Sequence, residues 1–303
     1  MSTPLSKRIS ILSDGLSSDV RQASQTARSM GFGGILFNVQ TPQLSIPELS
    51  QTGRREFRHT LAAQELKLVG LAASLGPDGL GPKADVDRVI DHLDRAMRAA
   101  VDLAAPLLCL DLGPLAEPAR EAKPRPKITP EQAGLIILPA EEPAVEPSPA
   151  SQAPVDQTLL TAVNTAMLEL CNRAERYGCT IALRSSLASF AAIEHVIAAA
   201  RCPWLGVDLD PVEMLADAWD IDEIFSRLGA LIRHVRARDA LSGTDHRTRP
   251  VVIGNGNVDW PSLLWHLDQS GYHSWLTIYP MELTDRLAAA REGLQKLTDS
   301  FRQ

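Results

Sequence analysis

The stretch Leu231–Asp239 holds the residue types most able to do chemistry in this chain. It starts apolar and ends charged, which is typical of a strand that leaves a core at its carboxyl end. Because alternate side chains of a strand share a face, His234, Arg236 and Arg238 point to one side. Parallel strands collect their chemistry at that end. A solvated edge strand is the alternative, but the apolar runs and helical patterns on both sides favour an inner strand.

Strand-like and helix-like patterns alternate along the chain, and this alternation places the face that carries His234, Arg236 and Arg238. Eight apolar runs of strand length each precede a helical pattern, which favours a single (β/α)8 barrel over an open doubly wound sheet. No Gly-x-Gly-x-x-Gly turn follows the first strand, and no phosphate-loop lysine motif is present. The predicted strands are Ile9–Leu12, Gly34–Val39, Leu68–Leu75, Leu107–Asp111, Cys179–Arg184, Trp204–Asp210, Leu231–Arg238 and Trp275–Tyr279.

Helices are predicted between these strands from apolar stripes at helical spacing. Ser17 and Ser18 are candidate N-caps of a first helix that ends at Met30, just before Gly31. The later predicted helices are Leu49–Leu66, Ala84–Leu103, Asp156–Tyr177, Phe190–Ala200, Ile221–Leu228, Asp259–Ser270 and Thr284–Phe301.

A proline- and glutamate-rich stretch, Pro114–Pro154, interrupts the alternation after the fourth strand. Repeated prolines cannot sustain a helix or a central strand, so residues 116–155 are predicted to be a loop insertion in a barrel domain that spans residues 1–303. The apolar run Leu135–Leu138 is a candidate for docking on the barrel. We expect the first protease cuts to fall in this insertion.

Composition and charge exclude several classes of function. A net charge of −7, a pI of about 5.5 and an aromatic content of 5% predict no nucleic-acid partner. The polar start of the chain and the lack of a long apolar run predict no membrane partner and a cytoplasmic location. The cysteines show neither zinc-site nor disulfide-framework spacing: Cys109, Cys171, Cys179 and Cys202.

Four segments are similar to a known family: Ser29–Ile35, Val207–Pro211, His234–Asp239 and Ile253–Trp260. His-Val-Arg-Ala-Arg-Asp is similar to the family's His-Val-His-x-Lys-Asp seventh strand, and Ile-Gly-Asn-Gly-Asn-Val-Asp-Trp to its Gly-x-Gly-x-x-Asp-Trp segment. In order and spacing the chain resembles the sugar phosphate isomerase/epimerase superfamily, the xylose-isomerase-like TIM barrels that include the type IV endonuclease branch. The resemblance covers almost the whole chain apart from the insertion. It implies the same barrel and a sugar isomerase or epimerase activity.

The resemblance also implies a divalent metal held by Glu, Asp, His and Glu at four strand ends. Those positions carry Arg184, Asp210, Arg236 and Tyr279 here, and a further family histidine falls on Glu213. Arginine is permanently protonated and has no lone pair for a metal. We therefore expect the metal site to be lost, and no cofactor is expected. Should purified protein retain a metal, the alternative ligands are Asp210, Glu213, His246 and Glu282.

Alternation along the last four strands predicts which of their side chains face the barrel interior. Arg184 and Arg236 can pair with Asp210 and Asp208, which would fill the lost metal site with ion pairs. Alternatively, three arginines facing two aspartates leave a positive surplus that suits a phosphate or carboxylate. Both interpretations can hold together. The predicted ligand contacts are Arg184, Asp208, Asp210, Arg236, Arg238 and Tyr279.

Three hypotheses about function follow. The first is an isomerase-like barrel without its metal that binds a small, sugar-like or anionic ligand. The second is a metal-independent isomerase or epimerase, whose proton-transfer pair would combine Asp210 or Glu282 with His234 or Tyr279. The third is a scaffold that binds a protein partner through the insertion. His234 is more often a hydrogen-bonded core histidine than a base, and Asp239 is expected to cap or pair.

Overall fold

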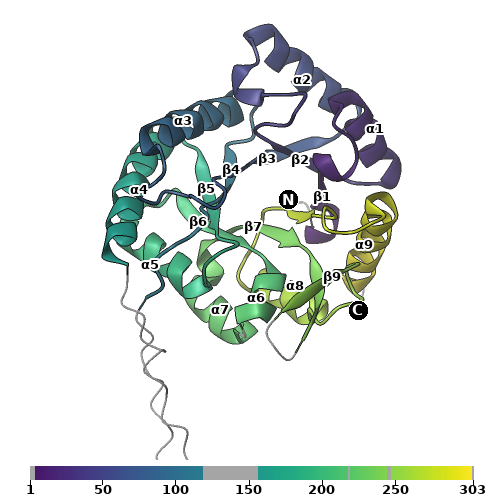
Figure 1. Ribbon diagram of the computed structural model, residues 1–303. Helices are drawn as coiled ribbons and strands as arrows, with labels where there is room; N and C mark the ends of the chain where they lie inside the picture. Colours follow the sequence, from purple (N-terminus) through teal and green to yellow (C-terminus); the bar gives the residue numbers. More distant parts are fainter. Residues whose placement is uncertain (1–3, 119–155, 218, 244–246, 302–303) are drawn as a thin grey trace, which may run out of the picture.

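The computed structural model describes residues 4–118, 156–217, 219–243 and 247–301 of the chain. Eight parallel strands close into a barrel in the order β1-β10-β7-β6-β5-β4-β3-β2, with helices around the outside (Figure 1). The predicted (β/α)8 fold is confirmed. The barrel strands are β1 (Ile9–Leu12), β2 (Gly34–Asn38), β3 (Lys67–Ser74), β4 (Leu107–Asp111), β5 (Thr180–Arg184), β6 (Leu205–Leu209), β7 (Ile232–Ala237) and β10 (Leu276–Ile278).

The outer helices follow the predicted pattern with shifted ends. Helix α2 ends at Ala63 rather than Leu66, because Glu65 takes a positive φ of 52° that a helix cannot hold. Short 3₁₀ turns occupy Leu5–Lys7, Ser13–Gly15, Ile46–Glu48 and Gly229–Leu231. The helices are α1 (Val20–Met30), α2 (Gln51–Ala63), α3 (Val86–Asp102), α4 (Gln157–Tyr177), α5 (Phe190–Ala200), α6 (Pro211–Asp217), α7 (Ile221–Leu228), α8 (Trp260–Gln269) and α9 (Arg286–Ser300).

The N-cap predicted for the first helix was wrong. Asp19 caps α1, because its carboxylate accepts the N–H of Gln22 at 2.7 Å. The Ser17 hydroxyl instead accepts the N–H of Asp19 and donates to the Gln22 side chain. A short side chain that accepts an N–H three residues later satisfies one of the unpaired donors of the first turn.

Two elements near the carboxyl ends of the strands were not predicted. Helix α6 starts directly after β6, where Asp210 accepts the N–H of Val212 at 3.1 Å and Pro211 opens the first turn. An antiparallel hairpin of β8 (Asp239–Ser242) and β9 (Thr248–Val251) follows β7 after one residue. Both lie over the barrel end where the strands finish, so they help to shape the site described below.

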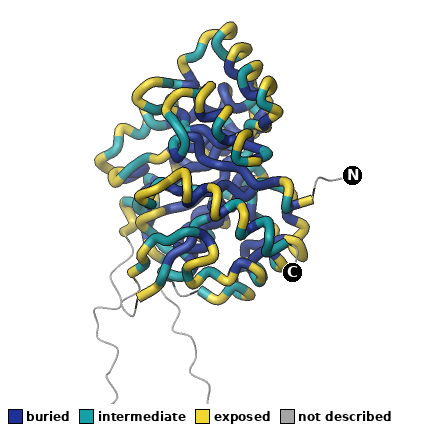
Figure 2. Tube along the Cα trace, turned by 90° about the vertical axis from the view of Figure 1, so that its right-hand side faces the viewer, coloured by how far each residue is buried: buried dark blue, intermediate teal, exposed yellow. Residues whose placement is uncertain are grey.

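The core forms two layers, seen as the dark interior of Figure 2. The larger layer packs between the sheet and the helices. A smaller apolar cluster comes from strands β1 to β5 and packs inside the barrel. The polar side chains of the interior come mainly from β6, β7 and β10. The smaller cluster consists of Leu12, Leu36, Val69, Ala72, Cys109 and Ala182.

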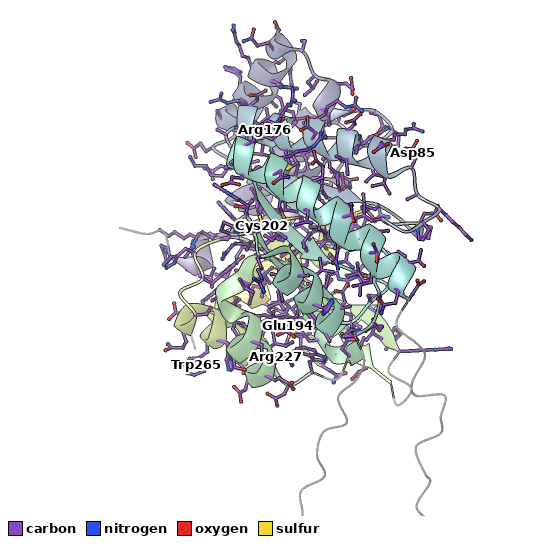
Figure 3. The ribbon with its side chains drawn as sticks, turned by 90° about the vertical axis from the view of Figure 1, so that its left-hand side faces the viewer. Asp85, Arg176, Glu194, Cys202, Arg227 and Trp265 are labelled. Atoms are coloured by element: carbon purple, nitrogen blue, oxygen red, sulfur yellow. The ribbon has the colours of Figure 1, made fainter. Side chains whose placement is uncertain are left out.

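The outer surface carries ion pairs between neighbouring helices. Arg227 of α7 and Glu194 of α5 point toward each other in Figure 3, and the Arg227 Nε donates to Glu194 Oε1 at 2.9 Å. In the part of the chain that the structure describes, no helix is long and apolar enough to cross a membrane. Most of the predicted insertion, residues 119–155, lies outside the described residues. The expectations about its docking and proteolysis therefore stay predictions.

Candidate ligand site at the barrel mouth

A buried carboxylate, Asp208, forms the base of the site. It is 1% exposed and accepts the Nδ1–H of His234 and the Nε–H of Arg236, each at 2.6 Å. Burial alone would raise the pKa of Asp208, but the charges and hydrogen bonds of Arg236 and His234 hold that pKa below its ordinary value. Asp208 is therefore an ionised anchor for the Arg236 guanidinium; the sequence had left open whether Arg236 pairs with Asp208 or with Asp210.

His234 is sealed inside the barrel. Its Nε2 lies 2.6 Å from Thr277 Oγ1, which lies 2.7 Å from Ser10 Oγ. Strand register aligns these groups, because Asp208 is paired with His234 and Ser10 with Thr277. With both ring nitrogens bonded and no exposed surface, His234 is the hydrogen-bonded core histidine that was expected. It has no open edge to serve as a base for a ligand.

Cys109, Asp208 and His234 bring potential metal-ligating atoms within 4.8 Å of one another. Burial raises the pKa of the Cys109 thiol well above its ordinary value, so it stays protonated, whereas a metal ligand must be a thiolate. Both oxygens of Asp208 are already bonded to Arg236 and His234. This cluster is a packed part of the interior and does not suit a metal ion.

Arg236 stands above Asp208 and is held on a second side by Tyr279. Its Cζ lies 4.3 Å from the centre of the Tyr279 ring, a cation–π contact. Burial would lower the pKa of Arg236, but Asp208 keeps that pKa well above its ordinary value. Its two terminal nitrogens make no hydrogen bond within the described residues, although Nε does. The guanidinium is thus fixed in place with one edge unused.

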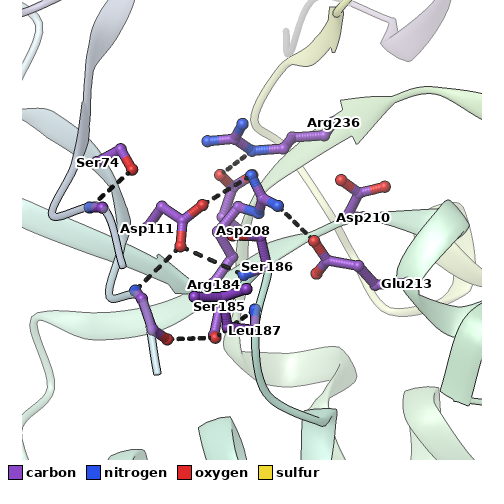
Figure 4. Close-up of polar contacts among 12 residues, drawn as sticks. Ser74, Asp111, Arg184, Ser185, Ser186, Leu187, Asp208, Asp210, Glu213 and Arg236 are labelled. Carbon is purple, nitrogen blue, oxygen red and sulfur yellow. Dashed lines mark hydrogen bonds and ion pairs between the residues drawn. The ribbon is translucent and has the colours of Figure 1, made fainter. Parts of the chain in front are cut away.

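Arg184 pairs differently from the prediction. Its Nη1 lies 3.2 Å from Asp111 Oδ2 and its Nη2 donates to Glu213 Oε1 at 2.5 Å, so it lies between these two carboxylates (Figure 4). The predicted contact with Asp208 or Asp210 was wrong. The reason is register: Arg184 and Asp111 are paired across β5 and β4, which brings their side chains together.

Arg238 is the arginine that pairs with Asp210. Its Nη2 lies 2.6 Å from Asp210 Oδ2, and its Nη1 donates to Glu282 Oε1 at 2.7 Å. Glu213 lies 3.9 Å from the same Nη2. Asp210 is fully buried, and its other oxygen caps α6, so this aspartate joins the start of a helix to an arginine of the site.

The positive surplus predicted for this end of the barrel is wrong. The three guanidiniums pair with five carboxylates, which we call together the mouth cluster: Arg184, Arg236, Arg238, Asp111, Asp208, Asp210, Glu213 and Glu282. Sequence reasoning counted only Asp208 and Asp210 against the arginines. It left out of that count Asp111 of β4, Glu213 of α6 and Glu282 after β10. Burial, together with the nearby Asp210 charge, raises the pKa of Glu213 to about 8. Even with Glu213 protonated, the remaining four carboxylates outnumber the guanidiniums.

A pocket of about 580 Å³ opens over the mouth cluster. Of the four predicted catalytic candidates, Tyr279 and Glu282 line it, whereas Asp210 and His234 do not. Among the predicted ligand contacts, the three arginines and Tyr279 line it, and the two aspartates lie behind the arginines. The Tyr279 hydroxyl is buried and has no hydrogen-bond partner within the described ranges. Other polar lining residues are Asn38, Asp111, Ser186, Glu213 and Thr248.

The residues at the four implied metal-ligand positions do not fit a divalent metal ion. Arg184 and Arg236 bring positive charge, and Asp210 is paired with Arg238. Burial raises the pKa of Tyr279 well above its ordinary value, which keeps the phenol protonated. One paired carboxylate and a neutral phenol are too few anionic donors for such an ion. Of the alternative ligands, His246 lies outside the described residues.

A second buried carboxylate, Asp239, has a structural role. It is 2% exposed and accepts the N–H groups of Ala240, Gly254, Gly256 and Val258 and the indole N–H of Trp260. A Cβ at position 256 would lie 2.0 Å from its Oδ1, so only glycine fits there. The glycine-rich segment noted in the sequence therefore wraps around Asp239, which pairs as expected.

Comparisons with solved structures agree with this barrel. A probable 3-DHS dehydratase from Bacillus anthracis has a TM-score of 0.69 at 13% identity, over 98% of this chain and 99% of that one. A 3-keto-D-glucoside 4-epimerase from E. coli has a TM-score of 0.66 at 14% identity, over 96% and 99%. The IOLI protein, solved with a bound zinc atom, has a TM-score of 0.70 at 14% identity, over 97% and 96%. At such identities the likeness shows the fold.

A comparison with curated proteins returned no match. The sequence profile of one family, described as xylose isomerase-like TIM barrel, matches residues 24–300. That range contains every residue of the mouth cluster as well as Asp239 and its glycine-rich segment. The chain belongs to the xylose isomerase-like TIM barrel family.

Proposed function

We propose that this chain binds a small sugar-derived ligand at the carboxyl-terminal mouth of its barrel, without a divalent metal. The observation that carries the proposal is Arg236. Asp208 and the Tyr279 ring hold its guanidinium where the family resemblance implies a metal-ligating histidine. A fixed cation with free N–H groups can orient and polarise a ligand oxygen, as preorganised donors do in other sites.

The composition of the pocket supports a hydroxyl-rich ligand. A hydroxyl both donates and accepts, and here guanidiniums that donate alternate with carboxylates that accept. The pocket volume, about 580 Å³, lies within the roughly 300–1,000 Å³ of small-molecule sites. The structural neighbour named as a 3-keto-D-glucoside epimerase adds support for a sugar.

The test is titration calorimetry of EDTA-dialysed protein with a panel of aldoses, ketoses and their reduced alditols. We expect saturable binding of at least one compound, unchanged when zinc, manganese or magnesium is added. Calorimetry is preferable to melting alone, because concentrated sugars stabilise most proteins by exclusion from the surface. Binding that appears only with added metal, or one metal equivalent retained through dialysis, would overturn the metal-free site.

A second candidate function, metal-independent isomerisation or epimerisation, rests on Glu213. It lines the pocket, Arg184 orients it, and its raised pKa lets it exchange a proton near neutral pH. Tyr279, also in the pocket, would be its partner in proton transfer. Incubation of bound sugars in D₂O, followed by NMR, should show exchange of a carbon-bound hydrogen that Glu213→Gln abolishes. If a ligand binds but none of its carbon-bound hydrogens exchanges, the isomerase function is refuted and only the binding function remains.

A further inference from the structure

Arg236 is restrained on two sides and open on one. Asp208 accepts its Nε–H at 2.6 Å, and the Tyr279 ring covers its face at 4.3 Å. The side chain is 9% exposed, and its terminal nitrogens pair with no carboxylate of the described chain. Arg184 and Arg238, in contrast, each use both terminal nitrogens on carboxylates. Arg236 is therefore the arginine of the mouth cluster whose terminal N–H groups remain for a ligand.

The open edge of Arg236 has a definite shape. Two N–H groups on one planar guanidinium edge match the two oxygens of a carboxylate. Tyr279 lines the same pocket, and its buried hydroxyl lacks a partner in the described chain. An unpaired buried hydroxyl is costly, so its place beside the arginine points to a ligand oxygen as its missing partner.

Charge decides which anion fits. Asp208 already balances Arg236, and the cluster as a whole holds more carboxylates than guanidiniums. A phosphate dianion would add two charges to a site without a positive surplus. A monocarboxylate adds one, placed directly on the open guanidinium edge. The hydroxyls of the same molecule can reach carboxylate acceptors, because Glu213 and Glu282 line the pocket.

We propose that the ligand is a polyhydroxy monocarboxylate, a sugar acid, whose carboxylate binds the terminal N–H groups of Arg236 and the Tyr279 hydroxyl. This rests on the proposed function in the same pocket and names its substrate class. The neutral part of the ligand would extend outward toward Glu213 and Glu282.

The carboxylate site is tested with a small matched pair, sodium glycolate and ethylene glycol, at constant ionic strength set with sodium chloride. We expect glycolate to bind saturably and to raise the melting temperature by about 2–4 °C at tenfold over its Kd, whereas ethylene glycol does neither. The double variant Arg236→Leu with Asp208→Asn removes both buried charges and should abolish glycolate binding. Arg55→Leu with Glu56→Gln is the matched control, because it removes one charge of each sign from exposed residues of α2 and likewise leaves the net charge unchanged.

Tyr279→Phe keeps the stacked ring and removes only the hydroxyl, so the glycolate Kd should rise about 5-fold. If the double variant fails to fold, Tyr279→Phe is the remaining test of the proposal, and an unchanged glycolate Kd in this variant overturns it. Equal binding of glycolate and ethylene glycol to the wild type also overturns it, as does glycolate binding that survives in the folded double variant.

Gluconate, sorbitol and glucose 6-phosphate then separate this inference from the proposed function. Gluconate should bind at least tenfold more tightly than the other two, and only the gluconate preference should disappear in the Arg236 double variant. Equal binding of gluconate and sorbitol would refute the sugar acid but keep a sugar site. Binding of glycolate while all three fail would refute the sugar and keep the carboxylate site. Tighter binding of glucose 6-phosphate would refute the charge argument.

Discussion

Asp208 and Asp239 are both buried aspartates near the ends of the adjacent strands β6 and β7, yet their carboxylates are hydrogen-bonded by different kinds of group. Side chains satisfy Asp208, through the ring of His234 and the guanidinium of Arg236. Asp239 is satisfied almost entirely by backbone N–H groups, with one indole N–H added. The first arrangement fixes the Arg236 guanidinium, where we propose that a ligand binds, and the second fixes the path of a loop.

The difference teaches which kind of site can change during evolution. A partner that is a side chain can be replaced together with the aspartate, so the pair can be exchanged for two neutral residues. A backbone N–H is present whatever the residue, so no second substitution can relieve its loss of a partner. The four predictions below test this contrast.

The largest effect is expected for Asp239→Ala. It leaves five donors without their acceptor, each costing about 1–3 kcal/mol where water cannot replace it, so we expect a loss of about 4–6 kcal/mol in the free energy of unfolding. Asp259→Ala is the matched control, because Asp259 is an exposed N-cap of α8 whose removal should cost about 1 kcal/mol. Urea denaturation measures both. Equal losses in the two variants would show that water replaces the Asp239 bonds.

The next effect is expected for Arg236→Leu, which orphans the buried Asp208 charge and should cost about 3–5 kcal/mol. Adding Asp208→Asn should recover part of that loss, in a double-mutant cycle measured by urea denaturation. No second substitution should rescue Asp239→Ala in this way. A cycle without any recovery would mean that Arg236 stabilises the barrel by packing rather than by charge.

A smaller effect is expected for Glu213→Gln and depends on pH. The folded protein holds a proton on Glu213 up to a pKa of about 8, whereas the unfolded chain releases it near 4.5. The free energy of unfolding should therefore fall as pH rises between those values, by on the order of 2–4 kcal/mol from this group. Glu213→Gln should remove that fall and be the more stable protein above pH 8. Parallel stability curves for the two proteins would contradict the raised pKa.

The smallest effect is expected for Tyr279→Phe. Its hydroxyl has no partner within the described residues, so its removal should leave stability unchanged or raise it by up to about 1 kcal/mol. This contrasts with both aspartates, whose partners are all present. A loss of more than about 1 kcal/mol in thermal or urea unfolding would mean that the hydroxyl is already bonded in the protein.

The sequence predicted the barrel well, because strand and helix periods alternate clearly and eight apolar runs have strand length. Strand alternation also predicted the inward face of His234 and Arg236, but it left open whether Arg236 pairs with Asp208 or with Asp210. Strand alternation did not predict that Arg184 contacts Asp111. The sequence of a single strand does not determine which residue of the neighbouring strand it is paired with. Helix α6 was missed because it is short and starts at Pro211, only one residue after β6.

Arg236 differs from a metal ion in one respect that follows from its covalent attachment. A guanidinium cannot dissociate, so its site has no occupancy to regulate and does not compete for scarce ions or admit a wrong one. It also carries one charge rather than two and offers donors in a single plane. In the proposed metal-free site, the variable geometry of a coordination sphere is replaced by a direction that is fixed when the chain folds. The specificity of such a site changes only by mutation, because the supply of metal ions does not affect it.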